Sequence, residues 1–314
     1  MKPTMRTYQN EEDYWRIREF LRRVQILNDF HQFSWPAMRL DYWWWFVNPY
    51  LKHLSPQESI FLWETEDGEI AAVLSAENPG VAYPQTHPAF RTPELEDEMI
   101  ATAEKHLAEA GQDGRRQVQI YIDSQDRSFQ DVLSRRGFQI VTRPGENEIQ
   151  HWRSLKDPLP EVPVIPGYTI RPLGDGLELL ERCYASGLGF HNDDIQYARR
   201  NRDHPEWYHG IQSAPLYRRD LDIVAVASDG SIAAFCTAWF DDVTRTGDLE
   251  PVATVPAHRR HGLGKAVCLE AMHRLQRMGC KTAFVTGYSE RANALYFSLM
   301  GPEHDISECW EKIY

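Results

Sequence analysis

The sequence predicts two α/β domains in tandem, each an α+β arrangement in which helices cover both faces of a mixed sheet. Three observations predict it: the length of 314 residues, a proline-rich segment near the middle, and sequence patterns that recur on either side of that segment. A chain of this length is comfortable as two domains, and its hydrophobic content of 42% is enough to build their cores.

The proline-rich segment spans residues 157–167 and contains four prolines. Proline fixes φ and removes a backbone donor, so this segment is expected to be a stiff, extended linker. The predicted domains are therefore residues 1–156 and residues 168–314.

The two halves repeat each other. Thr86–Glu96 aligns without a gap with Thr254–Gly264, 168 residues further on, and Asp67–Ala72 aligns with Asp229–Ala234, 162 residues further on. Similar offsets in the same order indicate an internal duplication with small loop differences.

Each half is predicted to run β-α-α-β-β-β-α-β-α-β, from apolar residues at helical or alternating spacing and from turn residues between them. Helices are expected at residues 11–27, 95–110, 128–135, 177–186, 196–212, 262–278 and 291–299. Residues 148–154 are expected to close the first sheet, and residues 308–314 the second.

A basic, glycine-containing loop, Val255–Lys265, stands between a predicted strand and a predicted helix. Gly262 and Gly264 let the backbone turn tightly and approach a ligand closely. The first amides of the following helix lack intrahelical acceptors, and the helix dipole favours an anion there. The side chains of Arg259, Arg260, His261 and Lys265 add donors, so the loop is a predicted phosphate or diphosphate site.

This element order and the Arg259-x-x-Gly262-x-Gly264 pattern resemble the GNAT N-acetyltransferase superfamily, here in a tandem arrangement. Asn293 and Tyr296 are similar to the family's later motif. The resemblance implies two acyl-CoA acyltransferase-like domains and acetyl-coenzyme A as the co-substrate, with no metal. The implied cofactor-binding residues are Val252, Ala253, Thr254, Val255, Arg259, Arg260, His261, Gly262, Leu263, Gly264, Lys265, Asn293 and Tyr296.

The first half departs from this pattern. Glu94 and Glu96 replace the two glycines, while Phe129 and Val132 replace the asparagine and the tyrosine. Two carboxylates would repel a diphosphate, so the first domain is expected to be degenerate: it keeps the fold but binds no acetyl-coenzyme A. It serves either as a packing partner or as one wall of a substrate cleft, and the sequence leaves both open.

The resemblance also suggests how the chemistry is divided. Tyr296 is the candidate general acid toward the departing thiolate, or an ordinary core aromatic. Asp248 and Glu250, two apart on a strand, are candidate general bases, or solvated edge charges. A backbone amide within Val252–Val255 is implied to polarise the acyl carbonyl, and Asn293 either contacts the cofactor or caps a helix.

The bulk composition limits the partners. A net charge of −12 argues against nucleic-acid and anionic-membrane partners, and no cysteine pair has metal-ligand spacing. Without a signal-peptide pattern or a long apolar run, the chain is expected to be cytoplasmic, as a monomer or homodimer. The predicted reaction is direct transfer of an acetyl group to a primary amine of a small molecule or peptide. Transfer from another acyl-CoA and a non-catalytic CoA sensor are the alternatives.

Overall fold

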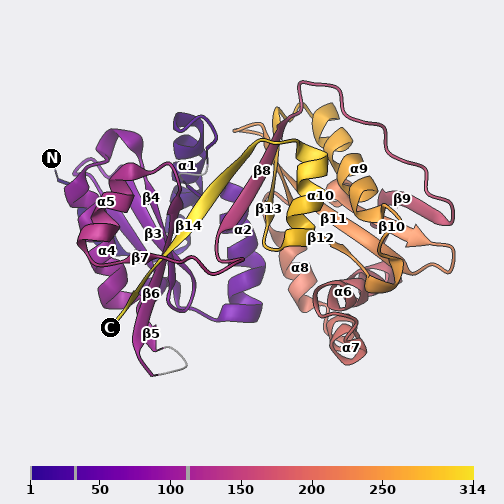
Figure 1. The fold of residues 1–314 in the computed structure, drawn as a ribbon, viewed down its shortest axis with the longest axis horizontal. Coiled ribbons are helices and arrows are strands. Elements are labelled where there is room, and N and C mark those ends of the chain that lie inside the picture. Colours follow the sequence, from indigo (N-terminus) through magenta and orange to yellow (C-terminus); the bar gives the residue numbers. More distant parts are fainter. Residues whose placement is uncertain (1, 32–33, 111–113) are drawn as a thin grey trace. The chain divides into compact units, whose positions relative to one another are not determined.

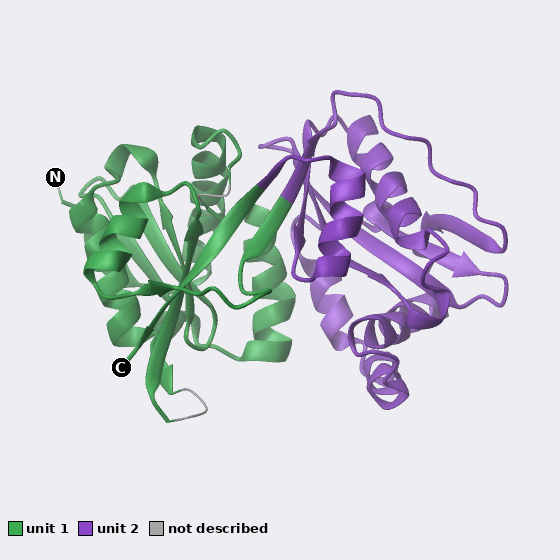
Figure 2. Cartoon of the chain, viewed as in Figure 1, with its two compact units in different colours: residues 1–150, 305–314 green, residues 151–304 purple. Residues whose placement is uncertain are grey.

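The computed structural model describes residues 2–31, 34–110 and 114–314. The chain forms two compact units, coloured separately in Figure 2: residues 1–150 together with 305–314, and residues 151–304. We call them the N-terminal unit and the C-terminal unit. These units differ from the predicted domains, because residues 151–167 lie with the C-terminal unit and the end of the chain lies with the N-terminal unit.

The N-terminal unit contains a sheet with the strand order β1-β2-β3-β4-β6-β14. Every neighbouring pair is antiparallel except β4 and β6, which are parallel. Two short strands, β5 (Glu109–Ala110) and β7 (Gln139–Ile140), extend it. The main strands are β1 (Thr4–Thr7), β2 (Ile60–Glu64), β3 (Ile70–Asn78), β4 (Val81–Thr86), β6 (Arg116–Asp123) and β14 (His304–Ile313).

Apolar residues on both faces of this sheet are buried under helices. Along β3, Val73 packs in a cluster with residues of α1, and the next residue, Leu74, packs on the opposite face in a cluster with residues of α4. Figure 1 shows the helices around this sheet. They are α1 (Glu11–Leu27), α2 (Ala37–Tyr42), a π-helical segment (Trp43–Lys52), α3 (Pro56–Ser59), a 3₁₀ turn (Pro88–Phe90), α4 (Pro93–His106) and α5 (Arg127–Arg135).

The C-terminal unit repeats the pattern with the strand order β8-β13-β12-β11-β10-β9, in which β12 and β13 are parallel. The predicted mixed α/β class is therefore confirmed for both halves. Its strands are β8 (Glu148–Ser154), β9 (Tyr168–Pro172), β10 (Asp222–Ala227), β11 (Ile232–Asp241), β12 (Thr246–Thr254) and β13 (Thr282–Gly287). Its helices are α6 (Leu177–Phe190), α7 (Ile195–Asp203), α8 (Glu206–Ser213), α9 (Leu263–Arg277) and α10 (Glu290–Met300), with 3₁₀ turns at Arg219–Leu221 and Pro256–His258.

The predicted helix over residues 196–212 is wrong as a single element. It divides into α7, which ends at Asp203, and α8, which begins at Glu206. Pro205 lies between them, and proline cannot donate the helical hydrogen bond and disfavours helical backbone in the residue before it.

The closing strand of each half forms where it was predicted, but it joins the sheet of the other half and not that of its own half. β14, from the end of the chain, pairs with β6 from Ser307 opposite Asp123 to Ile313 opposite Gln117. β8, from the end of the first half, stands beside β13 in the C-terminal unit. Each half thus supplies a strand to the sheet of the other half.

The proline-rich segment is extended but does not stand free of the domain. Leu159, Val162 and Ile165 pack against the core of the C-terminal unit. The ring Nε2 of His273 on α9 lies 2.9 Å from the carbonyl oxygen of Pro160. Apolar residues between the prolines hold the segment against α9, so it behaves as part of this unit rather than as a spacer.

In the described part of the chain, no helix combines the length and the apolar character that crossing a membrane requires. Among the same residues, no group of His, Cys, Asp and Glu side chains is arranged to hold a metal ion. All five cysteines are buried and free, and they pack as small apolar residues do.

Candidate active site

The parallel strands β12 and β13 pair briefly and then separate. Their register runs from Thr246 opposite Thr282 to Asp248 opposite Phe284, whereas β12 continues to Thr254. Beyond the last pair, the two strands no longer hydrogen-bond to each other. The backbone N–H and C=O groups that face the gap are therefore available to other hydrogen-bond partners. The structure thus contains the opening between strands that the family resemblance implies.

Only part of the predicted stretch of β12 can offer amides to this opening. The amide of Val255 donates to the carbonyl of Ala233 on β11 at 2.9 Å. Because donors alternate along a strand, the amide of Ala253 also faces β11, while those of Val252 and Thr254 face away from it. The candidates for polarising an acyl carbonyl are therefore Val252 and Thr254.

The start of α9 leaves three backbone donors without helical acceptors. Gly262 is the N-cap, has a left-handed φ of 81° and contributes no side-chain cap. The first helical bond joins the amide of Ala266 to the carbonyl of Gly262 at 3.1 Å. The amides of Leu263, Gly264 and Lys265 precede it, and together with the helix dipole they form an anion site.

Close packing fixes the loop in this shape. A Cβ added to Gly264 would lie 3.2 Å from Oγ1 of Thr254 and 3.3 Å from Cδ2 of Leu295, so a larger residue would displace the helix start. Arg259 donates from Nε to the carbonyl of Thr254 at 3.2 Å and from Nη2 to the carbonyl of Gly189 at 3.3 Å. Arg259 therefore ties the loop to β12 and α6.

The other basic side chains of the loop are open to a ligand. Arg260 has a left-handed φ of 70° and is exposed, and Lys265 is half-buried. Neither has a carboxylate partner within residues 2–31, 34–110 and 114–314. His261 is exposed, and its Nδ1 lies 3.2 Å from the carbonyl oxygen of His258. Three free amides, a glycine cradle and two unpaired cations fit the diphosphate of a coenzyme A thioester.

The two candidate bases differ in environment. Asp248 is only 6% exposed, and burial, together with the carboxylates of Glu250 and Asp241, raises its pKa to about 8. The alternative interpretation of Asp248 as a solvated edge charge is wrong. Glu250 is half-buried, and its backbone carbonyl accepts a hydrogen bond from Nε1 of Trp239 at 2.5 Å.

Tyr296 lies in the core of the C-terminal unit with Leu299 and Met300. Burial is the main reason that its pKa is raised well above the ordinary value, and nearby Cys268, Cys236 and Glu250 raise it further. The phenol therefore stays protonated at any working pH, as a proton donor must, but it is a weaker acid than a free tyrosine. Tyr296 is at once a core aromatic and a neighbour of the candidate base.

Asn293 does not cap its helix, because Ser289 fills that role by accepting from the amide of Ala292 at 3.3 Å. Instead Oδ1 of Asn293 lies 3.1 Å from Nε2 of His151. The buried ring of His151 also meets the ring of Tyr296 edge-on, with centroids 6.1 Å apart. A Cβ on Gly287 would overlap the Asn293 amide.

Sequence reasoning missed His151 because it precedes the proline-rich segment and was assigned to the first domain. The exchange of closing strands brings it, on β8, beside the motif residues Asn293 and Tyr296. Its Nδ1 is buried without a partner among the described residues. The sequence does contain one signal: His151 lies in a predicted closing strand, β8. Recognising that this strand joins the sheet of the C-terminal unit would have placed His151 near Asn293 and Tyr296.

The same region of the N-terminal unit is closed to an anion. The side chain of Thr92 caps α4 by accepting from the amide of Leu95 at 3.2 Å. Glu96, fully buried, forms an ion pair with Arg91, which also pairs with Asp126. The helix start therefore has a side-chain cap, and the arginine that corresponds to Arg259 is neutralised by carboxylates of the chain itself.

Comparisons with known proteins agree with this fold. Residues 180–301 match the model of the acetyltransferase (GNAT) family. No curated protein matches the chain.

The solved structures that resemble the chain along nearly its whole length include three acetyltransferase-like proteins. A GCN5-related N-acetyltransferase from Sphaerobacter thermophilus is 20% identical with a TM-score of 0.65, covering 99% of this chain and 95% of its own. A tandem GNAT protein from the clavulanic acid biosynthesis pathway is 12% identical with a TM-score of 0.61, covering 99% and 98%. A GNAT-family acetyltransferase from Colwellia psychrerythraea is 13% identical with a TM-score of 0.60, covering 98% and 100%. At these identities the likeness establishes a shared fold.

Proposed function

We propose that the chain is a tandem member of the GNAT acetyltransferase superfamily and that its C-terminal unit, which holds the residues 180–301 that match the family model, transfers an acetyl group from acetyl-coenzyme A to an amine. The observation that carries this proposal is the start of α9. There, the amides of Leu263, Gly264 and Lys265 lack helical acceptors, beside a glycine cradle and two cations without carboxylate partners. The diphosphate of coenzyme A satisfies these donors.

Several residues would hold and orient the cofactor. The start of α9, with Arg260 and Lys265, would bind the diphosphate, and Arg259 would keep the loop in shape through its bonds to Thr254 and Gly189. The amides of Val252 and Thr254 face the opening between β12 and β13, where a carbonyl oxygen would accept a hydrogen bond from them. Acetyl-coenzyme A supplies an acyl group that is activated as a thioester.

The proton-transfer roles follow from burial. An amine attacks only in its neutral form, and a carboxylate with a pKa near the working pH is suited to accept its proton. Asp248, with a pKa of about 8, meets this requirement, and Glu250 lies close enough to raise that pKa. Tyr296 keeps its hydroxyl proton and would donate it to the departing thiolate, while His151 and Asn293 would fix the face of α10 on which Tyr296 lies.

The acceptor would be a primary amine of a small molecule or peptide. The acidic candidate bases, Asp248 and Glu250, suit a substrate that arrives as an ammonium ion and leaves as an amide. We expect transfer within a ternary complex, because all five cysteines are buried core thiols and offer no accessible thiolate nucleophile.

The test is a thiol-release assay with acetyl-coenzyme A and a panel of primary amines, with the acetylated product identified by mass spectrometry. The proposal expects stoichiometric release of coenzyme A and N-acetylated amine. Binding without release across the panel would favour a CoA sensor, and release only with longer acyl-CoA donors would favour a different acyltransferase. The same assay with Gly262→Glu is the control for release at another site.

A further inference from the structure

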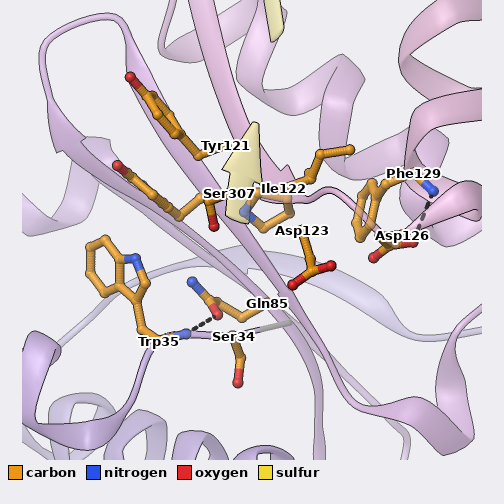
Figure 3. Close-up of a pocket in the computed structure, with 11 residues that line it drawn as sticks. Ser34, Trp35, Gln85, Tyr121, Ile122, Asp123, Asp126, Phe129 and Ser307 are labelled. Carbon is orange, nitrogen blue, oxygen red and sulfur yellow. Dashed lines mark hydrogen bonds between the residues drawn. The ribbon is translucent and has the colours of Figure 1, made fainter. Parts of the chain in front are cut away.

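A small pocket of the N-terminal unit lies where β4 and β6 separate. The two strands pair only at Val81–Gln119 and Ala82–Ile120. The residues that follow on both strands, among them Tyr83, Gln85 and Asp123, line the pocket. Figure 3 shows Gln85 and Asp123 there. It is the counterpart, in the first half of the repeat, of the opening between β12 and β13.

Several polar atoms in the pocket lining have no partner in the described residues. The side chain of Ser34 and the indole of Trp35 are each more than nine-tenths buried, and both Oγ and Nε1 lack a hydrogen-bond partner. Asp123 is 4% exposed; its Oδ1 accepts from the amide of Gln125 at 2.7 Å, and its second oxygen accepts no bond from the described chain. Ser34 Oγ and Trp35 Nε1 are enclosed by the protein, whereas the second oxygen of Asp123 is an acceptor that a donor in the pocket would satisfy.

The charge of the pocket is negative and uncompensated. Its described lining contains two carboxylates and no basic side chain. Asp126 pairs with Arg91 outside the pocket, which leaves Asp123 alone. Arg39, which lies over the ring of Tyr83, is already paired with two other carboxylates.

The groups around Asp123 keep its charge available near neutral pH. Burial, with smaller contributions from Asp305 and Asp126, raises the pKa of Asp123 to about 6, and His31 lowers it slightly. Nδ1 of His31 lies 3.1 Å from Oδ1 of Asp305, so the nearest imidazole is directed to a different carboxylate. Asp123 is therefore mostly ionised above pH 7 and forms no ion pair with the described residues.

The corresponding strand end in the C-terminal unit carries no such group. β6 ends at Asp123, and β13 ends at Gly287, 164 residues further on, where the side chain of Asn293 fills the space. A carboxylate at this strand end is thus a property of the N-terminal unit and not of the fold.

We propose that this pocket of the N-terminal unit binds the ammonium group of a small primary amine. The cavity volume is about 20 Å³, which admits one group of the size of water, such as –NH₃⁺, while the pocket opens to solvent for the rest of the molecule. The second oxygen of Asp123 supplies the charge-assisted hydrogen bond. The proposal does not depend on acyl transfer in the C-terminal unit.

The test uses ligand-observed NMR of the full chain at pH 7.5, with n-propylammonium as the probe and propan-1-ol and propionate as neutral and anionic controls. We expect saturable binding of the ammonium alone. Asp123→Asn, which keeps the acceptor for the Gln125 amide, should weaken binding about tenfold. Asp131→Asn, which removes the same charge from an exposed site on α5, should leave it unchanged.

A measurement on the wild-type protein tests the proposal even if Asp123→Asn folds poorly. Binding should weaken about tenfold between pH 7.5 and pH 5, as Asp123 takes up a proton. Equal binding of propan-1-ol, competition by sodium ions at millimolar concentration, or unchanged affinity in Asp123→Asn would overturn the proposal. Acetyl-coenzyme A titration of the same variants shows separately whether the C-terminal site is intact.

Discussion

The two units have the same sheet order around a splayed parallel strand pair, yet they treat the following helix start in opposite ways. In the N-terminal unit, Thr92 caps α4, and buried Glu96 pairs with Arg91. In the C-terminal unit, Gly262 caps α9 without a side chain, and Gly264 leaves room beside β12. The comparison teaches that the same fold can close a helix start with a side-chain cap and a buried ion pair, or leave its amides without a cap where glycines replace those side chains.

The largest effect is expected when the C-terminal loop receives the residue of its counterpart. Gly262→Glu places a side chain on a backbone with a φ of 81° and a negative charge at the helix start. We expect acetyl-coenzyme A affinity to fall by at least about 100-fold, measured by calorimetry. Gly230→Glu is the matched control, because Gly230 has a φ of 85° in an exposed turn of the same unit. The affinity of this variant for acetyl-coenzyme A should stay at the wild-type level. Equal losses in the two variants would contradict a specific role for the loop.

The next effect concerns Tyr296, the candidate proton donor, whose counterpart in the N-terminal unit is Val132. Tyr296→Phe keeps the aromatic packing and removes the hydroxyl, so kcat should fall about 100-fold while the Kd for acetyl-coenzyme A stays within about twofold. Steady-state kinetics with the best amine of the panel measures the first, and calorimetry the second. Turnover at the wild-type rate would leave Tyr296 with a packing role alone.

A smaller effect is expected in the N-terminal loop, and on stability instead of binding. Glu96→Gln weakens a buried ion pair and leaves Arg91 partly uncompensated, so the free energy of unfolding should fall by about 1–3 kcal/mol. Glu94→Gln, at an exposed position two residues earlier, should change it by less than about 0.5 kcal/mol. Urea unfolding measures both. A change in acetyl-coenzyme A affinity in Glu96→Gln would show that the N-terminal loop is not closed to the cofactor.

A further effect on stability depends on pH and concerns Asp248. The pKa of Asp248 is about 8 in the folded chain and ~3.9 in the unfolded chain. Its contribution to the free energy of unfolding is therefore fully present below pH 4 and is lost as the pH rises through 8. Asp248→Asn removes this pH-dependent loss of stability. Compared with wild type, the variant should gain up to about 1.4 kcal/mol per pH unit between pH 5 and 8. Thermal unfolding at pH 5 and pH 8.5 tests this, and a constant difference between the two proteins would contradict the raised pKa.

The features that the sequence predicted correctly depend mostly on residues that are close together along the chain. The positions of the strand, loop and helix around Gly262 and Gly264 follow from glycine conformation and from apolar periodicity, and the structure has them within a residue or two. The division at Pro205 could also have been predicted, because proline rarely continues a helix. Such features depend on neighbours along the chain.

The remaining features depend on residues far apart in the sequence. The assignment of β8 and β14 to each other's sheets depends on which edge each strand meets, and strand patterns alone do not encode this. His151 was missed for that reason. Likewise, the pKa of Asp248 and the isolation of Asp123 follow from burial and from neighbours such as Asp241 and Asp305, which only the folded chain brings together.

The central claim is that the chain has one acetyl-coenzyme A site and that it lies in the C-terminal unit. Calorimetric titration of the wild-type chain with acetyl-coenzyme A tests it most directly, read as stoichiometry and repeated with Gly262→Glu. The account predicts one molecule bound per wild-type chain and none detectable for the variant. Two molecules bound per chain, or one molecule bound with unchanged affinity by Gly262→Glu, would contradict it.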